Sequence, residues 1–416
     1  MRFVSSLSVV ELARFPGTAL DAPNIPRAIK PLLADAIELS MIGMDSANPA
    51  QQGLAWKIHL FAARVLLGPV AVRGGRRRVT GRIRRIQLTL QARVERFKRG
   101  EWQELWGEVR CRSAQGPRAT SDESVAAHVE ELVRAGYYSK ATRRLEEGEL
   151  APPTEATHSK LCALNPNGAL SGPMPNPEAA PNPLELGAES FRSCLITCPK
   201  GSAAGPSGWR MEAYAMVAEH CVPEDGVEDS VLYRVCSAVA AGRIPPAIQP
   251  YFAGGRLLGL SKPDGGTRPI VCGEGLRRLV GRLITGGMRD SFAEHFAPAR
   301  MRQSSDPAPD QPVEANQLGV GIKGGAEEVA HLVTVALESN PVQGDDGYVC
   351  VSVDFKNFFN SISRPAIFRQ LLEHDKFKSL WPLLSNLYSK DSPARLWADL
   401  GGDQEWDDIE SREGVH

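Results

Sequence analysis

Apolar residues recur at helical spacing over several long stretches of the chain. In the first, from residue 54 to residue 66, they occur every three or four positions. Lys57, His59 and Arg64 interrupt this stretch, so we expect an amphipathic helix of a soluble protein rather than a membrane span. The same spacing predicts further helices at 211–220, 230–242, 274–295, 326–339, 364–374 and 380–388.

Shorter stretches have the composition of β-strands. Residues 256–262 and 267–271 flank the segment Pro263-Asp264-Gly265-Gly266, whose Pro and Gly residues favour a tight turn, so a β-hairpin is predicted. Residues 349–353 form an apolar, β-branched run that predicts a short buried strand. Asp354 follows directly at the end of this run.

A change in composition indicates a domain boundary. Residues 149–184 are rich in Pro, Asn, Ala and Gly, and we expect them to bury little apolar surface and to form a linker. The linker would separate a mainly helical, arginine-rich region, residues 1–148, from residues 185–416, where strands and helices mix. The expected fold class is therefore α+β.

The N-terminal region contains a block of arginines. An apolar stripe at helical spacing continues through it, which predicts a packed helix with an arginine-rich outer face. Guanidinium groups form forked hydrogen bonds with phosphate, so this face is a candidate nucleic-acid contact, and a solvated charged face is an equally weighted alternative. The candidate residues are Arg76, Arg77, Arg78, Arg82, Arg84 and Arg85.

Composition narrows the class of protein only slightly. The hydrophobic share of 42% and the charged share of 23% are those of an ordinary soluble protein, and the net charge is −1. Eight scattered cysteines suit reduced thiols in the cytoplasm or nucleus rather than a disulfide scaffold. The N-terminus lacks the features of a signal peptide, and no transmembrane segment is expected.

Three segments carry candidate chemistry. A carboxylate at the end of a buried strand, such as Asp354, either caps the following turn or binds a cation such as Mg²⁺. Lys262 and Arg268 flank the hairpin turn, where two cations suit a triphosphate, although incidental surface charges are the alternative. The glycine-rich loop at 200–209 precedes a helix and suits an anion, but it lacks the Gly-Lys-Ser/Thr of a Walker loop.

Taken in order, four motifs resemble the reverse transcriptase domain of non-LTR (LINE-type) retrotransposons. They are the Gly205-Pro206-Ser207-Gly208 loop, the hairpin at 260–270, the helix entry Gln317-Leu318-Gly319 and the segment at 353–361. The resemblance covers residues 185–416, a little over half of the chain. It implies the fingers and part of the palm of a right-hand polymerase fold, truncated before the second palm motif.

The resemblance also implies roles for single residues. Asp354 would be the first catalytic aspartate and a ligand of two Mg²⁺ ions, with the backbone carbonyl of Phe355 as a further metal ligand. Lys262 and Arg268 would hold the phosphates of the incoming nucleotide, and Phe359 would exclude a ribose 2′-hydroxyl, although a core aromatic is the alternative. The implied partners are an RNA template, a DNA primer and deoxynucleoside triphosphates.

The sequence departs from this family in one respect that matters for catalysis. The Gln-Gly-Asp-Pro-like motif and the later Asp-Asp pair are missing, and the residues from Ser411 to His416 resemble those that lead into the first of them. We do not assign Trp406-Asp407-Asp408 as the pair, because it lies in a polar stretch with no predicted buried strand before it. We therefore expect an RNA-directed DNA polymerase domain that is incomplete and inactive on its own, so that its status as an enzyme stays open. The alternative is a non-catalytic RNA- or DNA-binding protein derived from a retroelement.

Overall fold

The fold is known from a computed structural model, which divides into two compact units. One contains Met1–Arg282 and Asn357–His416, the other contains Leu283–Lys356, and each is described by itself. The residues that the structure describes are 1–14, 25–68, 70, 79–113, 122–134, 136, 138, 141–142, 150–167, 172–178, 181–198, 202–262, 264–296, 324–339, 351–355, 357–388, 394–398, 400, 406–412 and 414–415.

The first unit begins with a group of helices. α1 (Arg2–Ser6), α2 (Val9–Arg14) and the 3₁₀ helix η2 (Arg27–Ile29) precede α3 (Lys30–Met41) and α4 (Pro49–Leu67). α4 begins at Asn48, whose side chain accepts hydrogen bonds from the backbone N–H groups of Ala50 and Gln51 at 3.0 and 3.2 Å. A helix is therefore confirmed where the apolar spacing predicted it.

The character of α4 differs from the prediction. His59 and Arg64, which we expected on the polar face of an amphipathic helix, are both buried. The last nine residues of the helix, from His59 to Leu67, are all buried, so α4 is a core helix with two polar side chains that need internal partners. Among the described residues, none of the helices combines the length and the apolar character that a bilayer span requires.

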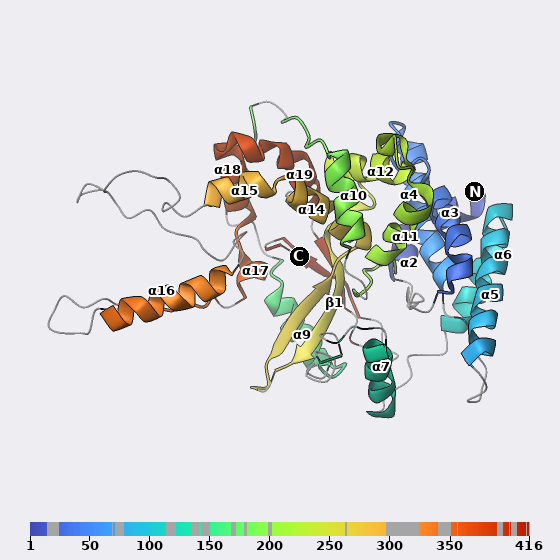
Figure 1. The fold of residues 1–416 in the computed structure, drawn as a ribbon, viewed down its shortest axis with the longest axis horizontal. Coiled ribbons are helices and arrows are strands. Elements are labelled where there is room, and N and C mark those ends of the chain that lie inside the picture. The colour runs from blue at the N-terminus through green and yellow to red at the C-terminus, as the bar shows by residue number, and fades with distance from the viewer. Residues whose placement is uncertain are drawn as a thin grey trace. The chain divides into compact units, whose positions relative to one another are not determined.

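The N-terminal helices pack against helices from the second half of the sequence. α3 lies against α4 and against α11 (Met211–Cys221), with α12 (Val231–Ala240) also in contact (Figure 1). α10 (Ala188–Ile196) and η3 (Val227–Asp229) adjoin this group. Segments on both sides of the predicted linker therefore share one compact unit, whereas the sequence placed them in separate domains.

A mixed four-stranded sheet lies in the same unit. Its order is β2-β1-β3-β4, with β1 (Gly255–Ser261) antiparallel to β2 (Thr267–Cys272) and parallel to β3 (Ala394–Ala398), which pairs antiparallel with β4 (Ile409–Ser411). One face of the sheet is covered by α9 (Glu155–Leu164), and α13 (Gln249–Ala253) contacts β3. The core on the covered face consists of Leu161, Leu257, Leu396, Ala398, Leu400, Trp406 and Ile409. This combination of helices and sheet confirms the α+β class.

The segment predicted as a linker contributes to this core. α9 lies inside 149–184, and its Leu161 is fully buried. Ala151 is buried too, and its backbone N–H donates to the carbonyl of Gly259 in β1 at 2.9 Å. The expectation that residues 149–184 bury little apolar surface is therefore wrong at Ala151 and Leu161.

The bounds of the remaining helices complete the description of the two units. α5 (Val79–Arg99) and α6 (Trp102–Ser113) pack against each other, and Trp102 and Trp106 contact Phe61 of α4. α7 is Asp122–Arg134. Later in the chain come α14 (Gly275–Gly287), α15 (Arg289–Phe296), α16 (Gly325–Ser339), α17 (Phe358–Ser361), α18 (Arg364–Glu373), the 3₁₀ helix η5 (Asp375–Leu380) and α19 (Trp381–Tyr388).

Over the described residues 351–353, the strand predicted before Asp354 does not form. Residues 351–355, in the second unit, belong to no strand or helix, and Val351 and Val353 are 73% and 65% exposed. Residues 349 and 350 lie outside the described residues. The prediction of a buried strand is wrong for 351–353, because β-branched composition becomes a strand only when neighbouring strands pair with it.

Candidate functional site

Lys262 and Arg268 lie on the same face of the β1–β2 hairpin. Leu260 and Arg268 are directly opposite partners, so their side chains share one face. Lys262 is two residues beyond Leu260, and its backbone N–H donates to the Gly266 carbonyl at 2.9 Å, which continues the ladder by one more pair. The hairpin is therefore confirmed, and its two cations lie on one side of its tip.

The environment of these two cations is open. Both side chains are exposed, and among the described residues neither forms an ion pair with a carboxylate. The opposite face of β1 is closed, because a Cβ at Gly259 would lie 3.3 Å from Ala151 and 3.6 Å from Thr157 of α9. The turn is fixed by Asp264, whose side chain accepts the N–H of Gly266 at 2.9 Å; Pro263 lies outside the described residues.

The proposed metal ligands lie in the other unit. Asp354 and Phe355 belong to the exposed extended segment 351–355, so the Asp354 carboxylate faces solvent. A carboxylate and a backbone carbonyl are the oxygen ligands that Mg²⁺ prefers, so the donor chemistry of these residues fits the ion. Among the described residues, no group of three or more His, Cys, Asp or Glu side chains is placed to hold a metal.

Phe359 belongs to the first unit and lies in the single-turn helix α17. Its ring is 69% exposed, so the alternative of a core aromatic is wrong. Asn357 precedes the helix in a left-handed conformation, with φ of 58°, which is uncommon outside glycine.

The Gly205-Pro206-Ser207-Gly208 loop binds an anion that belongs to the protein itself. The carboxylate of Glu274 accepts hydrogen bonds from the backbone N–H and the hydroxyl of Ser207, at 2.6 and 2.5 Å. A Cβ at Gly205 would lie 2.7 Å from the Gly273 carbonyl and the Glu274 Cα, so only glycine allows this approach. The anion-binding capacity inferred from the sequence is therefore used internally, to join the loop to the segment after the hairpin.

Burial dominates the electrostatics of this junction. It raises the pKa of the Glu274 carboxyl, although the hydrogen bonds from Ser207 and the charge of Arg64 act in the opposite direction. Burial also lowers the pKa of Arg64 to about 10. The Arg64 guanidinium donates to the carbonyls of Leu12 and Ala13, both at 3.4 Å, and to that of Pro206 in the loop.

Next to this junction lies a series of buried polar side chains linked by hydrogen bonds, which was not predicted from the sequence. His59 Nδ1 lies 2.9 Å from the Ser40 hydroxyl, and His59 Nε2 lies 3.0 Å from the Tyr214 hydroxyl. Ser40 donates its proton to the Ile37 carbonyl, so Nδ1–H donates to Ser40 and Nε2 accepts from Tyr214. Burial lowers the pKa of His59 to about 3 and holds the imidazole neutral. The sequence feature that could have indicated these hydrogen bonds is a histidine within the apolar pattern of α4.

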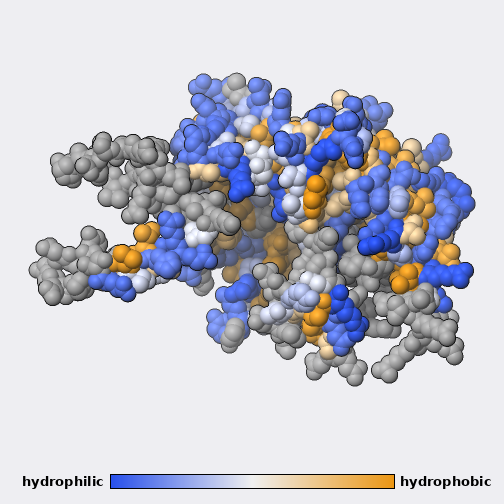
Figure 2. Space-filling view, in the orientation of Figure 1, coloured by the Kyte–Doolittle hydropathy of each residue, from blue (hydrophilic) through white to orange (hydrophobic). Residues whose placement is uncertain are grey.

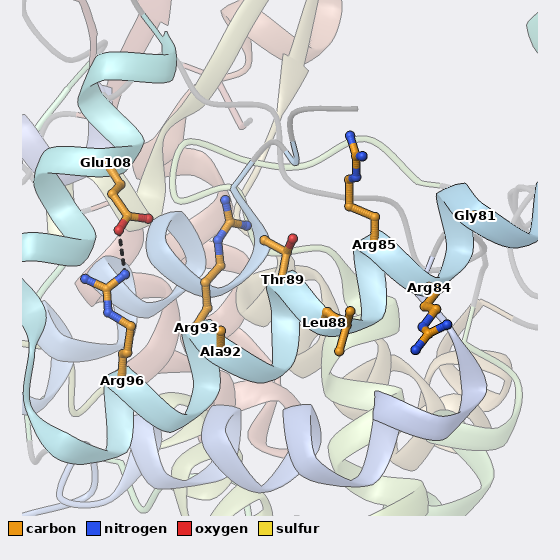
Figure 3. A pocket seen from close by; sticks show the side chains of 9 residues that line it. All are labelled: Gly81, Arg84, Arg85, Leu88, Thr89, Ala92, Arg93, Arg96 and Glu108. Carbon is orange, nitrogen blue, oxygen red and sulfur yellow. Dashed lines mark hydrogen bonds and ion pairs between the residues drawn. The ribbon is translucent and has the colours of Figure 1, made fainter. Parts of the chain in front are cut away.

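The described part of the arginine block lies on α5. Arg76, Arg77 and Arg78 fall outside the described residues, as does the side chain of Arg82. Arg84 and Arg85 are exposed and line a groove of about 460 Å³ together with Leu88, Thr89 and Ala92 (Figure 3). The surface over α5 and α6 is mostly hydrophilic with scattered hydrophobic residues (Figure 2).

Two other arginines of this groove are used inside the protein. Arg93 is buried and donates to the carbonyl of Gly68 at 2.6 Å, at the C-terminal end of α4. Arg96 binds Glu101 and Glu108 at 2.9 and 2.5 Å, and these hydrogen bonds raise the pKa of Arg96. The exposed end of the groove, at Arg84 and Arg85, is therefore the part that is open to a ligand.

The Trp406-Asp407-Asp408 segment differs from its expected surroundings. Trp406 is buried in the core and stacks on His158, with ring centroids 5.2 Å apart. β4 begins at Ile409 directly after it, and Asp408 lies 3.9 Å from Arg395 of β3. The segment is therefore part of the sheet's edge rather than an isolated polar stretch.

No protein-family model matches this sequence, and no curated protein matches it either.

Proposed function

We propose that this chain carries the nucleotide-binding fingers and part of the palm of a retroelement reverse transcriptase. The observation that supports this most is the hairpin, which presents Lys262 and Arg268 on one exposed face of its tip. Two cations held at a fixed spacing neutralise the charge of a triphosphate, which a single surface lysine does not. The order of the four motifs along the sequence supports the same assignment.

In this proposal the other residues have the roles that the resemblance implies for them. The Asp354 carboxylate and the Phe355 carbonyl supply oxygen ligands for Mg²⁺, which would stabilise charge on the phosphates when bound. Phe359 has an exposed ring that suits contact with the sugar of a deoxynucleotide. The RNA template and DNA primer would be the other substrates.

The same proposal predicts that the 416-residue polypeptide does not polymerise alone. The sequence supplies Asp354 but lacks the later aspartate pair with which the family completes the coordination of two metal ions. Nucleotide binding and nucleotide transfer are therefore separable here. The polypeptide is expected to bind a deoxynucleoside triphosphate without transferring it.

Equilibrium binding of fluorescent dTTP to the full chain tests this function. We expect Lys262→Ala combined with Arg268→Ala to weaken binding by about tenfold or more, since hydrogen bonds to charged groups are lost. The charge-matched control is Arg84→Ala combined with Arg85→Ala, which removes two positive charges from α5. Equal loss in both double variants would show non-specific charge attraction and would contradict the proposal.

A second function is supported by the exposed arginines of α5. Arg84 and Arg85 are open to solvent beside a groove, whereas Arg93 and Arg96 are used internally, so this face suits the phosphate backbone of RNA or DNA. Binding of single-stranded RNA by the full chain should fall with salt. The Arg84→Ala/Arg85→Ala variant should reduce the slope of log K against log salt by about 0.7 for each phosphate that it no longer neutralises. An unchanged slope would contradict this function.

A further inference from the structure

Arg364 is a buried arginine at the first position of α18, and only 1% of it is exposed. Its Nε donates to the carbonyl of Gly414 at 2.9 Å, and its Nη2 donates to the carbonyl of Ser411 at 3.1 Å. The guanidinium also lies 5.2 Å from the ring centroid of Tyr388. A buried guanidinium is costly without such partners, so these contacts fix the C-terminal segment 411–415 against α18.

The segment held by Arg364 bonds in turn to the backbone around Phe359. The N–H of Val415 donates to the carbonyl of Phe359 at 2.8 Å, and the N–H of Gly414 donates to the carbonyl of Ile362 at 3.0 Å. Gly414 has φ of 73°, and a Cβ there would lie 2.5 Å from the Cα of Asn360. Gly414 and Val415 therefore lie directly on the single turn of α17.

The end of α9 holds the same turn from another side. Asn357 Nδ2 donates to the carbonyl of Leu164 at 2.8 Å, and Asn360 Nδ2 donates to Oδ1 of the buried Asn165 at 3.1 Å. The N–H of Arg412 donates to the carbonyl of Pro166 at 3.1 Å, so the C-terminal segment is itself tied to α9. Two segments distant in sequence, the end of α9 and the C-terminal segment, thus hold residues 357–362.

We propose that Arg364 is a positioning residue for Phe359: it clamps residues 411–415 onto α17 and thereby sets the direction in which the aromatic ring points. The clamp fixes the backbone of Phe359 while leaving its ring exposed, which is how a side chain is presented to a ligand rather than packed in a core. The role of the ring against the nucleotide sugar rests on the proposed function. The clamp itself does not.

Hydrogen exchange of the full chain tests the clamp. Arg364→Gln should accelerate exchange by about tenfold or more at residues 357–362 and 411–415, because the charge-assisted bonds to the carbonyls of Ser411 and Gly414 are removed. The matched control is Arg369→Gln, which changes an exposed arginine of the same helix and should leave both segments unchanged. Gly414→Ala places a Cβ against Asn360, which disrupts the contact between the C-terminal segment and α17, and should therefore give the same result. Unchanged exchange at 357–362 in both Arg364→Gln and Gly414→Ala would overturn the proposal.

A second readout tests the consequence for the ring. The ratio of dUTP affinity to UTP affinity should fall toward one in Arg364→Gln, as in Phe359→Ala, while dUTP affinity itself is retained. A ratio that Phe359→Ala abolishes and Arg364→Gln leaves intact would overturn the positioning role. If the wild-type chain binds neither nucleotide, the proposed function fails, and hydrogen exchange alone decides whether the clamp exists.

Discussion

The carboxylate of Glu274 accepts two hydrogen bonds from Ser207, one from its backbone N–H at 2.6 Å and one from its hydroxyl at 2.5 Å. This pair joins the glycine-rich loop to the residues that follow the hairpin. Both residues are buried, so the bonds form in a region of low dielectric, where an unpaired partner is costly.

We predict strong coupling between these two residues. In a double-mutant cycle of Ser207→Ala and Glu274→Ala, urea unfolding at neutral pH should give an interaction free energy of about 1–3 kcal/mol. Glu274→Ala alone should cost the most, since it leaves Ser207 and the nearby Arg64 charge without their carboxylate. Costs that add to within about 0.5 kcal/mol would show that the pair contributes little.

The buried imidazole of His59 predicts a pH dependence of stability. Its pKa falls from the ordinary value of 6.5 to about 3 in the folded protein, so between these values the unfolded state binds the extra proton. Folding stability contributed by neutral His59 is therefore present above pH 6.5 and is lost as the pH falls. The slope is about 1.4 kcal/mol per pH unit.

This slope is measured as a difference between two proteins. Urea unfolding of the wild type and of His59→Gln at several pH values from 7.5 to 4.5 removes contributions from groups common to both. The wild type should lose stability faster on acidification, so the difference between the two free energies of unfolding should change with pH. A constant difference would mean that His59 is charged in the folded state or accessible to solvent.

Primer extension tests the prediction that one aspartate is insufficient. Purified full chain with a poly(rA) template, an oligo(dT) primer, dTTP and Mg²⁺ should give no extension above background. Incorporation that disappears in Asp354→Ala would contradict this and would identify a substitute carboxylate. Asp407 and Asp408 would be the first to exchange for Asn, because they lie at the start of β4.

Local patterns predicted the hairpin and the helices well. The turn at 263–266 combines proline and glycine signals with flanking apolar runs, and the register follows from the length of the turn, so the sequence alone places Lys262 and Arg268 on either side of it. The helices at 211–220 and 364–374 were found by spacing alone. These features depend on residues close together in the sequence.

The features that sequence could not give depend on distant partners. His59 and Arg64 are polar residue types common at protein surfaces, but Tyr214 and Pro206, which are among the partners that satisfy them, come from beyond the predicted linker. Asn165 was assigned to that linker for its composition, yet it is buried and binds Asn360. The run at 349–353 has strand composition, but over 351–353 the structure shows no strand, because composition cannot specify a pairing partner.

The proposed function depends most directly on binding of a triphosphate at the hairpin tip. Photocrosslinking with the γ-azidoanilide of dTTP, which carries its reactive group on the terminal phosphate, locates that site in the full chain. We expect the adduct to map to residues 255–272, to be removed by excess dTTP, and to be absent in the Lys262→Ala/Arg268→Ala variant but retained in Arg84→Ala/Arg85→Ala. An adduct on α5, or labelling that excess dTTP does not remove, would contradict the assignment of this hairpin as a nucleotide-binding element.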